Sequence, residues 1–176
     1  MLLGFRPIGY VEWDDYCQRV LAARIRDGIL PDAPIFGDIK TFISDGYAAS
    51  YTGLVDVVTA GFPCPPFSVA GKRQGESDSR NMWPATIEAI RIVRPRHVFL
   101  ENVPGLLSSG QALILIALEK VRQFDLFGAK DPQSFTGRFI RHIFKTSGMR
   151  YFGRVLGDLA ESGYDADWTV LGADDC

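Results

Sequence analysis

A cysteine between prolines is the residue of this sequence best suited to covalent chemistry. Cys64 lies in the motif Pro63-Cys64-Pro65-Pro66, shortly after the Val-rich run from Leu54 to Ala60. The prolines restrict the backbone and would hold the thiol in one direction, which a cysteine that only fills space does not need. Because a thiolate is a strong nucleophile, we expect Cys64 to act as one. Cys17 lies in an apolar helical pattern and is expected to be a small core residue.

Acidic residues follow three other short apolar runs, in the pairs Glu12-Trp13, Asp38-Ile39 and Glu101-Asn102. Ligands of an open α/β sheet bind at the carboxyl ends of its strands, so one crevice would collect these pairs together with Cys64. Glu101 is either a structural carboxylate with its hydrogen bonds satisfied or a functional acid with a raised pKa. A reactive thiol beside it favours the second interpretation. Glu12 and Asp38, taken alone, are equally well explained as helix caps.

The elements that must position these residues alternate between strand and helix patterns. Strands are expected at Ile8 to Val11, Ala33 to Phe36, Leu54 to Ala60, His97 to Leu100 and Tyr164 to Leu171. Helices are expected from Asp14 to Gly28, from Asn81 to Val93 with Pro84 in the first turn, from Gln111 to Gln123, and from Phe152 to Gly163. Repeated β-α alternation predicts an α/β fold with a mostly parallel, doubly wound sheet.

The segment from Ser108 to Arg150 interrupts this rhythm and is a candidate insertion. Beyond its apolar first part it mixes glycine, proline, aromatic and basic residues without a clean period. From Arg138 to Arg154 there are basic residues and no acidic ones. Such a stretch is either a solvated helix face or a patch that contacts phosphates.

Composition limits the class of protein. The 176 residues are 47% hydrophobic and carry a formal charge of -2, which fits one soluble domain and gives no argument from bulk basicity for nucleic acid. The 3 cysteines form no CxxC pair and are joined by only 2 histidines, so neither a zinc site nor a disulfide scaffold is expected. No apolar run approaches the ~18 residues of a membrane span. We expect a cytoplasmic protein with no membrane partner.

Together these motifs resemble the catalytic core of DNA (cytosine-5) methyltransferases. The resemblance rests on the run from Gly61 to Ser68, on Asp78-Ser79-Arg80-Asn81, and on Glu101-Asn102-Val103-Pro104-Gly105, with Glu12-Trp13 and Gly37-Asp38-Ile39 upstream. It covers roughly Gly9 to Leu107 and Tyr151 to Ala173. It implies a Rossmann-like, S-adenosylmethionine-dependent methyltransferase fold.

The resemblance implies roles for the catalytic residues. The thiolate of Cys64 would add to C6 of cytosine, so that C5 becomes able to attack a sulfonium methyl group. Glu101 would contact N3 of the ring and stabilise the charge that develops there, while Asn102 would hold the loop. No residue is identified as the base that removes the C5 proton.

The resemblance also implies how the cofactor and the DNA would be held. Glu12 would accept hydrogen bonds from the ribose of S-adenosylmethionine, and Trp13, Asp38 and Ile39 would meet the adenine. Trp83 and Pro63 would close that pocket. The partner would be double-stranded DNA with a flipped cytosine, covered by the loop from Ser68 to Ser79. Residues expected on the DNA side are Ser68, Lys72, Arg73, Arg80 and Asn102.

The family pattern extends beyond this chain at both ends. The Gly-rich turn and central strand that precede Glu12 in the family have no counterpart here, nor does the target-recognition region that follows. We therefore expect an incomplete catalytic domain with unpaired strand edges, which is either a truncated gene product or one half of a split enzyme completed by a complementary methyltransferase chain. The alternatives are a non-catalytic DNA-binding module and, less favoured for want of a nearby resolving cysteine, a thiol redox protein.

Overall fold

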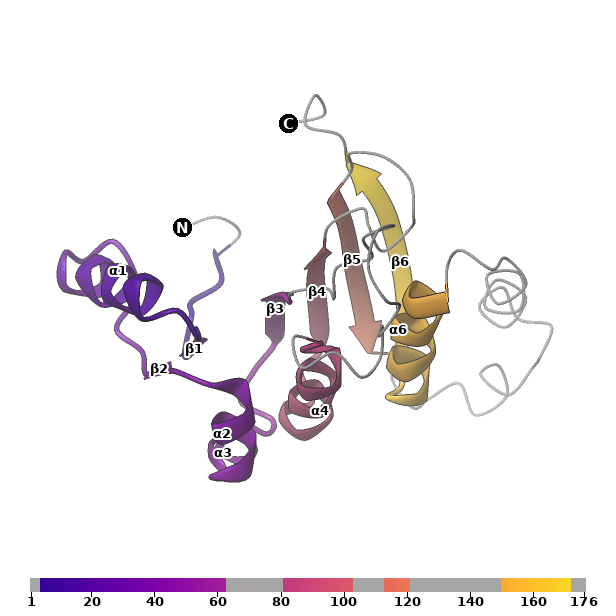
Figure 1. Ribbon diagram of the computed structural model, residues 1–176, viewed down its shortest axis with the longest axis horizontal. Helices are drawn as coiled ribbons and strands as arrows, with labels where there is room; N and C mark the ends of the chain where they lie inside the picture. Colours follow the sequence, from indigo (N-terminus) through magenta and orange to yellow (C-terminus); the bar gives the residue numbers. More distant parts are fainter. Residues whose placement is uncertain (1–3, 63–80, 103–112, 121–149, 172–176) are drawn as a thin grey trace, which may run out of the picture.

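A computed structural model of the chain describes residues 4–62, 81–102, 113–120 and 150–171, and for 113–120, 150 and 168–171 it describes the backbone only (Figure 1). The strands form two sheets, one of two strands and one of four. The predicted site residues are divided between the two sheets, with Glu12 and Asp38 at the first and Glu101 and Asn102 at the second. None of the helices within the described ranges is long and apolar enough to cross a membrane.

The first unit is a strand, a helix and a second strand. β1 (Tyr10–Val11) pairs in parallel with β2 (Ile35–Phe36), and α1 (Asp15–Arg26) connects them. Asp14 caps α1 as predicted, because its side chain accepts a hydrogen bond from the backbone N–H of Cys17 at 3.0 Å. Gly28, just beyond the helix, has the positive φ of 73° that glycine tolerates.

The helix α1 differs from the expectation in one respect. Its apolar residues have the predicted helical spacing, yet no residue of α1 is buried. Cys17 is exposed, so the prediction that it fills a core position is wrong. Leu21 and Ile25 on that face are half-buried, so the described elements cover it only in part.

A small aromatic cluster joins this unit to the rest of the chain. It involves α2 (Ile39–Ser44) and α3 (Tyr47–Ser50), whose Phe42 and Ala48 pack with Val93. Phe36 and Tyr51 lie against this cluster, and the rings of Phe36 and Phe42 are 4.8 Å apart. Burial of these side chains is the main apolar contact between the β1–β2 pair and the larger sheet.

The four-stranded sheet is mixed. β3 (Val57–Gly61) and β4 (His97–Asn102) are parallel, whereas β5 (Leu113–Lys120) is antiparallel both to β4 and to β6 (Tyr164–Leu171). The expectation of a mostly parallel sheet is therefore met in part, because β3, β4 and β6 run in the same direction and β5 runs against them. The expectation followed from β-α alternation, which does not reveal that one strand of the sheet runs in the opposite direction.

The predicted helix from Gln111 to Gln123 is also wrong, because Leu113–Lys120 is the strand β5. An apolar run of this length fits a buried strand and a helix equally well by periodicity alone. Pairing with a strand on each side decides between them, since β5 satisfies its backbone groups on both edges. Whether residues 108–150 are an insertion stays a prediction, although part of them pairs into the sheet.

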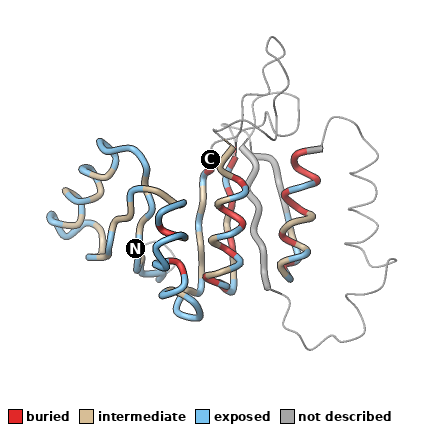
Figure 2. The backbone as a smooth tube through the Cα atoms, turned by 60° about the horizontal axis from the view of Figure 1, so that its bottom comes forward, coloured by how far each residue is buried: buried red, intermediate tan, exposed pale blue. Residues whose placement is uncertain are grey.

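Two helices cover one face of the four-stranded sheet. α4 (Trp83–Val93) and α6 (Arg150–Glu161) pack against Val98 and Leu100 of β4, which are 0% and 1% exposed. His97, Phe99 and Glu101 alternate with them along the strand and are more exposed. Figure 2 shows the buried positions gathered on α4 and α6. Within the described ranges, then, the helices do not cover both faces as a doubly wound sheet would require.

Local sequence signals for these helices are confirmed. Pro84 lies in the first turn of α4, where its missing N–H costs nothing. The N-cap is Met82, one residue after the predicted Asn81, whose Oδ1 still accepts a hydrogen bond from the Trp83 N–H at 3.2 Å. The predicted inward positions Ile87, Ile90 and Val93 are all buried. Gly163 follows α6 with φ 85°, and the last strand has its predicted bounds.

Tyr164 links β6 to the loop between α4 and β4, and its chemistry gives a pH test. Its hydroxyl donates to the Pro95 carbonyl at 2.8 Å in a buried site. Burial raises the pKa of Tyr164 from its ordinary value of 10.0 to about 12, against a smaller opposing effect of Arg94. The folded state thus favours the protonated phenol. That contribution to stability is complete below pH 10 and is lost as the pH rises towards 12.

We predict that Tyr164→Phe lowers the free energy of unfolding by about 1–2 kcal/mol at pH 8, because the Pro95 carbonyl loses its donor. By pH 11 the difference should shrink by ~1 kcal/mol, since Tyr164 then ionises in the unfolded wild-type chain. Urea unfolding of both proteins at the two pH values measures this. A difference that stays constant with pH would contradict it.

Candidate functional site

The first part of the predicted site lies at the carboxyl end of the β1–β2 pair. The Glu12 N–H donates to the Phe36 carbonyl at 2.9 Å, so the parallel ladder extends one residue beyond β1. Asp38 follows β2 at the same end of the pair and caps α2, with Oδ1 accepting from the Lys40 N–H at 2.9 Å. The expectation that Glu12 and Asp38 lie at neighbouring strand ends is met by this geometry.

Hydrogen bonds hold Glu12 in place. Its Oε1 accepts from the Asp14 N–H at 2.8 Å, and its carbonyl accepts from Nε2 of Gln18 at 2.8 Å. Gln18 lies on α1, so the helix fixes the backbone at the strand end. Sequence reasoning missed Gln18, because a glutamine on a helix surface carries no signal for such a contact.

The aromatic and apolar members of this group differ in exposure. Trp13 is 77% exposed, and its indole is open to a ligand. Ile39 opens α2 and is half-buried. Carboxylates can accept hydrogen bonds from hydroxyl and amino groups, and an exposed indole can stack on a flat ring. This strand end has the chemistry to hold a nucleoside.

The second part of the site lies at the carboxyl end of β3 and β4. Gly61 pairs directly with Glu101 across the parallel ladder, and the Glu101 side chain is exposed. Asn102 is only 7% exposed, and its Nδ2 donates to the Phe62 carbonyl at 3.0 Å. Asn102 thus ties the end of β4 to the residue that follows β3.

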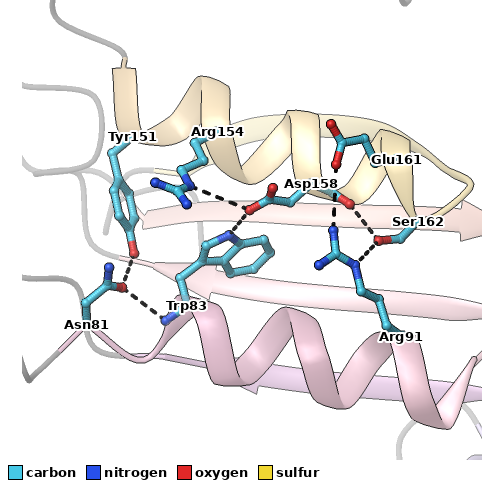
Figure 3. A network of polar contacts seen from close by, with 8 residues as sticks. All are labelled: Asn81, Trp83, Arg91, Tyr151, Arg154, Asp158, Glu161 and Ser162. Atoms are coloured by element: carbon cyan, nitrogen blue, oxygen red, sulfur yellow. Dashed lines mark hydrogen bonds and ion pairs between the residues drawn. The ribbon is translucent and has the colours of Figure 1, made fainter. Parts of the chain in front are cut away.

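Trp83 lies deep in the core. It is 1% exposed, its ring centroid is 5.1 Å from that of Phe62, and its Nε1 donates to Oδ2 of Asp158 at 2.7 Å (Figure 3). No sequence pattern indicated Asp158 as its partner, since 75 residues separate the two. A role for Trp83 in closing a cofactor pocket stays a prediction.

The remaining predicted site residues lie outside the described ranges. They are Pro63, Cys64, Ser68, Lys72, Arg73 and Arg80, together with most of the basic stretch 138–154. The described residues bring Glu12 and Trp13 together with Asp38 and Ile39, and Glu101 and Asn102 together with Phe62. These two groups belong to separate sheets.

Comparison with known proteins gives a consistent picture. A family model described as C-5 cytosine-specific DNA methylase matches residues 1–130. Type II methyltransferase M.NgoMIV of Neisseria gonorrhoeae is 41% identical over 106 residues, which is 59% of this chain and 30% of that protein. Type II methyltransferase M.HpaII of Haemophilus parainfluenzae is 36% identical over 130 residues, 70% of this chain and 32% of that protein.

This chain covers a larger share of a third relative. Type II methyltransferase M.AquIA of Picosynechococcus sp. is 36% identical over 133 residues, 68% of this chain and 51% of that protein. The chain thus spans between 30% and 51% of the length of these three relatives.

We predict that Asn102→Ala lowers the free energy of unfolding by about 1–3 kcal/mol, because the Phe62 carbonyl loses its donor in a buried site. Thr52→Ala is the matched control, since it removes an exposed hydrogen bond to the Ile92 carbonyl of similar length, 2.9 Å. We expect the control to cost about 0.5 kcal/mol or less. Urea denaturation compares the two, and equal losses would count against a special role for Asn102.

Proposed function

Because the chain belongs to the C-5 cytosine-specific DNA methylase family, we propose that it takes part in transferring a methyl group from S-adenosylmethionine to C5 of cytosine in DNA. The observation that carries the proposal is the family match over residues 1–130, which includes both Cys64 and Glu101. The geometry of the two strand ends supports it. S-adenosylmethionine supplies an electrophilic methyl group; the protein must supply the nucleophile and orient the base.

Cys64 and Glu101 are the proposed catalytic pair. Gly61 pairs with Glu101 across the parallel ladder. Cys64 follows Gly61 after three peptide units, so its Cα can lie at most about 11 Å from that of Gly61. The Cys64 thiolate forms a bond to C6 of cytosine, and the Glu101 carboxyl donates a hydrogen bond or proton at N3. After C5 has taken the methyl group, loss of the C5 proton breaks the Cys64–C6 bond and releases the thiolate.

The β1–β2 end is the proposed site for S-adenosylmethionine. Glu12 accepts hydrogen bonds from the ribose hydroxyls, as its fixed backbone and carboxylate permit. Trp13 packs on the adenine, with Asp38 and Ile39 at its edge and face. The exposed indole and the two neighbouring carboxylates are what this ligand requires. Pro63 and Trp83 complete the pocket in this proposal.

The DNA partner is proposed to present a flipped cytosine to Cys64. Lys72, Arg73 and Arg80 contact phosphates, and Ser68 and Asn102 lie on the side of the base. A duplex keeps C6 of cytosine within the base stack, so the thiolate reaches it only after the base has left the helix.

A complementary methyltransferase chain is the second proposed partner. Within the described ranges β1 pairs only with β2 and β3 only with β4, so one edge of β1 and one edge of β3 lack a neighbouring strand. Open edges invite pairing with another strand. Ile8 and Val11, before and within β1, are exposed apolar residues that such a partner would cover. Addition of a strand there would extend the sheet that carries the cofactor residues.

We predict that the chain, alone or mixed with a complementary fragment, forms a covalent adduct with DNA containing 5-fluorocytosine when S-adenosylmethionine is present. Cys64→Ser should reduce adduct formation by about a thousandfold or more, because a serine hydroxyl is not ionised at neutral pH. Denaturing gel electrophoresis detects the adduct. Cys17→Ser is the control, since Cys17 is exposed on α1, and it should leave the yield unchanged. Salt-dependent DNA binding with no adduct in any preparation would instead favour the non-catalytic module.

We predict that Glu12→Gln raises KM for S-adenosylmethionine about tenfold, because a neutral amide is a weaker acceptor for ribose hydroxyls than a carboxylate. Glutamine keeps an oxygen for the Asp14 N–H, so the strand end stays in place. Initial rates of labelled methyl transfer measure the effect. Asp15→Asn removes a neighbouring exposed charge that pairs with Arg19 and should change KM by less than about twofold. Equal effects of both changes would contradict a specific contact.

A further inference from the structure

The parallel pairing of β1 and β2 ends where the proposed cofactor residues begin. The last bond of the ladder runs from the Glu12 N–H to the Phe36 carbonyl, at 2.9 Å. In the regular parallel pattern the next bond would run from the Asp38 N–H to the Glu12 carbonyl. That carbonyl accepts instead from a side chain, Nε2 of Gln18, at 2.8 Å. A side-chain amide thus takes the place of the next backbone bond.

The Gln18 amide contacts both strand ends. On the β1 side Nε2 makes a second, longer hydrogen bond of 3.5 Å to the Trp13 carbonyl. On the β2 side it lies against Gly37, because a Cβ added at Gly37 would be 3.3 Å from Nε2. Gly37 directly precedes Asp38. The amide therefore lies at the end of both strands, next to the proposed cofactor residues.

The close approach of Gln18 gives residue 37 a reason to be glycine. The backbone of Gly37 does not have the positive φ that favours glycine at other positions of the chain. A Cβ at 3.3 Å from Nε2 would be closer than ordinary van der Waals contact, so the amide would have to move. Apart from the chain neighbours of Gly37, no other atom of the described residues lies within 4 Å of that position. Among the described groups, the Gln18 amide is thus the one that restricts residue 37.

Helix α1 fixes the position of Gln18. The Gln18 N–H donates to the Asp14 carbonyl at 2.9 Å, which places Gln18 in the first turn of the helix. The Asp14 N–H in turn donates to Oε1 of Glu12 at 2.8 Å. The start of one helix thus holds both the carbonyl and the carboxylate of Glu12.

We propose that Gln18 is a positioning residue for the cofactor, one that fixes the spacing between Glu12 and Asp38. A nucleoside that contacts both carboxylates needs them at one separation. A protein that already holds this separation loses no binding free energy to ordering it, whereas a protein that holds it for part of the time binds more weakly in proportion. The role rests on the proposed binding of S-adenosylmethionine at these residues. It is independent of the reaction at Cys64.

The first test is Gln18→Ala in the full chain, alone or mixed with a complementary fragment, titrated calorimetrically with S-adenosylmethionine. No residue of α1 is buried and alanine favours a helix, so the substitution leaves the helix in place. We expect the Kd to rise about fivefold, as for the loss of one hydrogen bond. In a preparation that transfers methyl groups, KM for S-adenosylmethionine should rise by a similar factor while kcat changes by less than about twofold.

Gly37→Ala tests the contact from the other strand. The added Cβ should push the Gln18 amide away from the Glu12 carbonyl and raise the Kd about threefold. In the double variant with Gln18→Ala the amide is gone, so Gly37→Ala should then change the Kd by less than about 1.5-fold. Effects that multiply, as they do for independent sites, would contradict the coupling of the two strand ends through Gln18.

Tyr51→Phe is the matched control. It also removes one side-chain hydrogen bond to a backbone carbonyl, that of Ile8 at 3.1 Å, but Ile8 lies just before β1, at the opposite end of the strand from Glu12. The ring stays in the aromatic cluster. We expect the Kd to change by less than about twofold. Equal rises for Gln18→Ala and Tyr51→Phe would overturn the positioning role.

Hydrogen exchange without ligand separates this inference from the proposed function. Loss of the Gln18 contacts should make exchange in a peptide covering 9–14 about fivefold faster. Unchanged exchange or an unchanged Kd for Gln18→Ala, with a wild type that binds S-adenosylmethionine, refutes the positioning role and leaves the proposed function standing. A wild type that binds no S-adenosylmethionine in either preparation refutes the proposed cofactor site and, with it, the role of Gln18.

Discussion

The larger part of the described fold depends on one apolar interface, in which α4 and α6 pack side by side on one face of the four-stranded sheet. Trp83 lies at its centre, in contact with Phe62 on one side and bonded to Asp158 on the other. Removal of this surface from water provides the main driving force, and the indole N–H is a polar group that must find a partner there. Asp158 supplies that partner. The parallel strands β3 and β4 contribute Val98, Leu100, Val58 and Ala60 to the same core.

The extent to which the sequence predicts the fold follows from how local each signal is. The Asp14 cap, Pro84 at the start of α4 and the bounds of β6 were predictable because each depends on residues close in sequence. The strand Leu113–Lys120 was not, because its conformation depends on pairing with β4 and β6. The exposure of Cys17 was not either, since helical spacing shows which face is apolar but not whether anything covers it.

For the candidate site, too, only some of the residues could be predicted from the sequence. Strand ends attract ligand-binding residues, and this rule located Glu12, Asp38 and Glu101 correctly at the carboxyl ends of parallel strands. The contact partners of Glu12, Asn81 and Trp83 were missed. Gln18, Tyr151 and Asp158 act through contacts with residues that no spacing rule connects to them. Sequence patterns identify groups that react or bind more readily than the groups that hold these in position.

The lack of burial along α1 has a consequence for how the chain folds. The β1–α1–β2 unit is joined to the remainder mainly through the cluster around Phe42, so it has far fewer apolar contacts than the four-stranded sheet. Such a unit can open locally at a lower free energy than the rest of the molecule. A nucleoside that binds at Glu12 and Asp38 would favour the closed form in proportion to its concentration. Ligand occupancy and the folding equilibrium of this unit are then thermodynamically linked. Bound ligand raises the fraction of closed units, and a more stable closed form lowers the ligand concentration that gives half-occupancy.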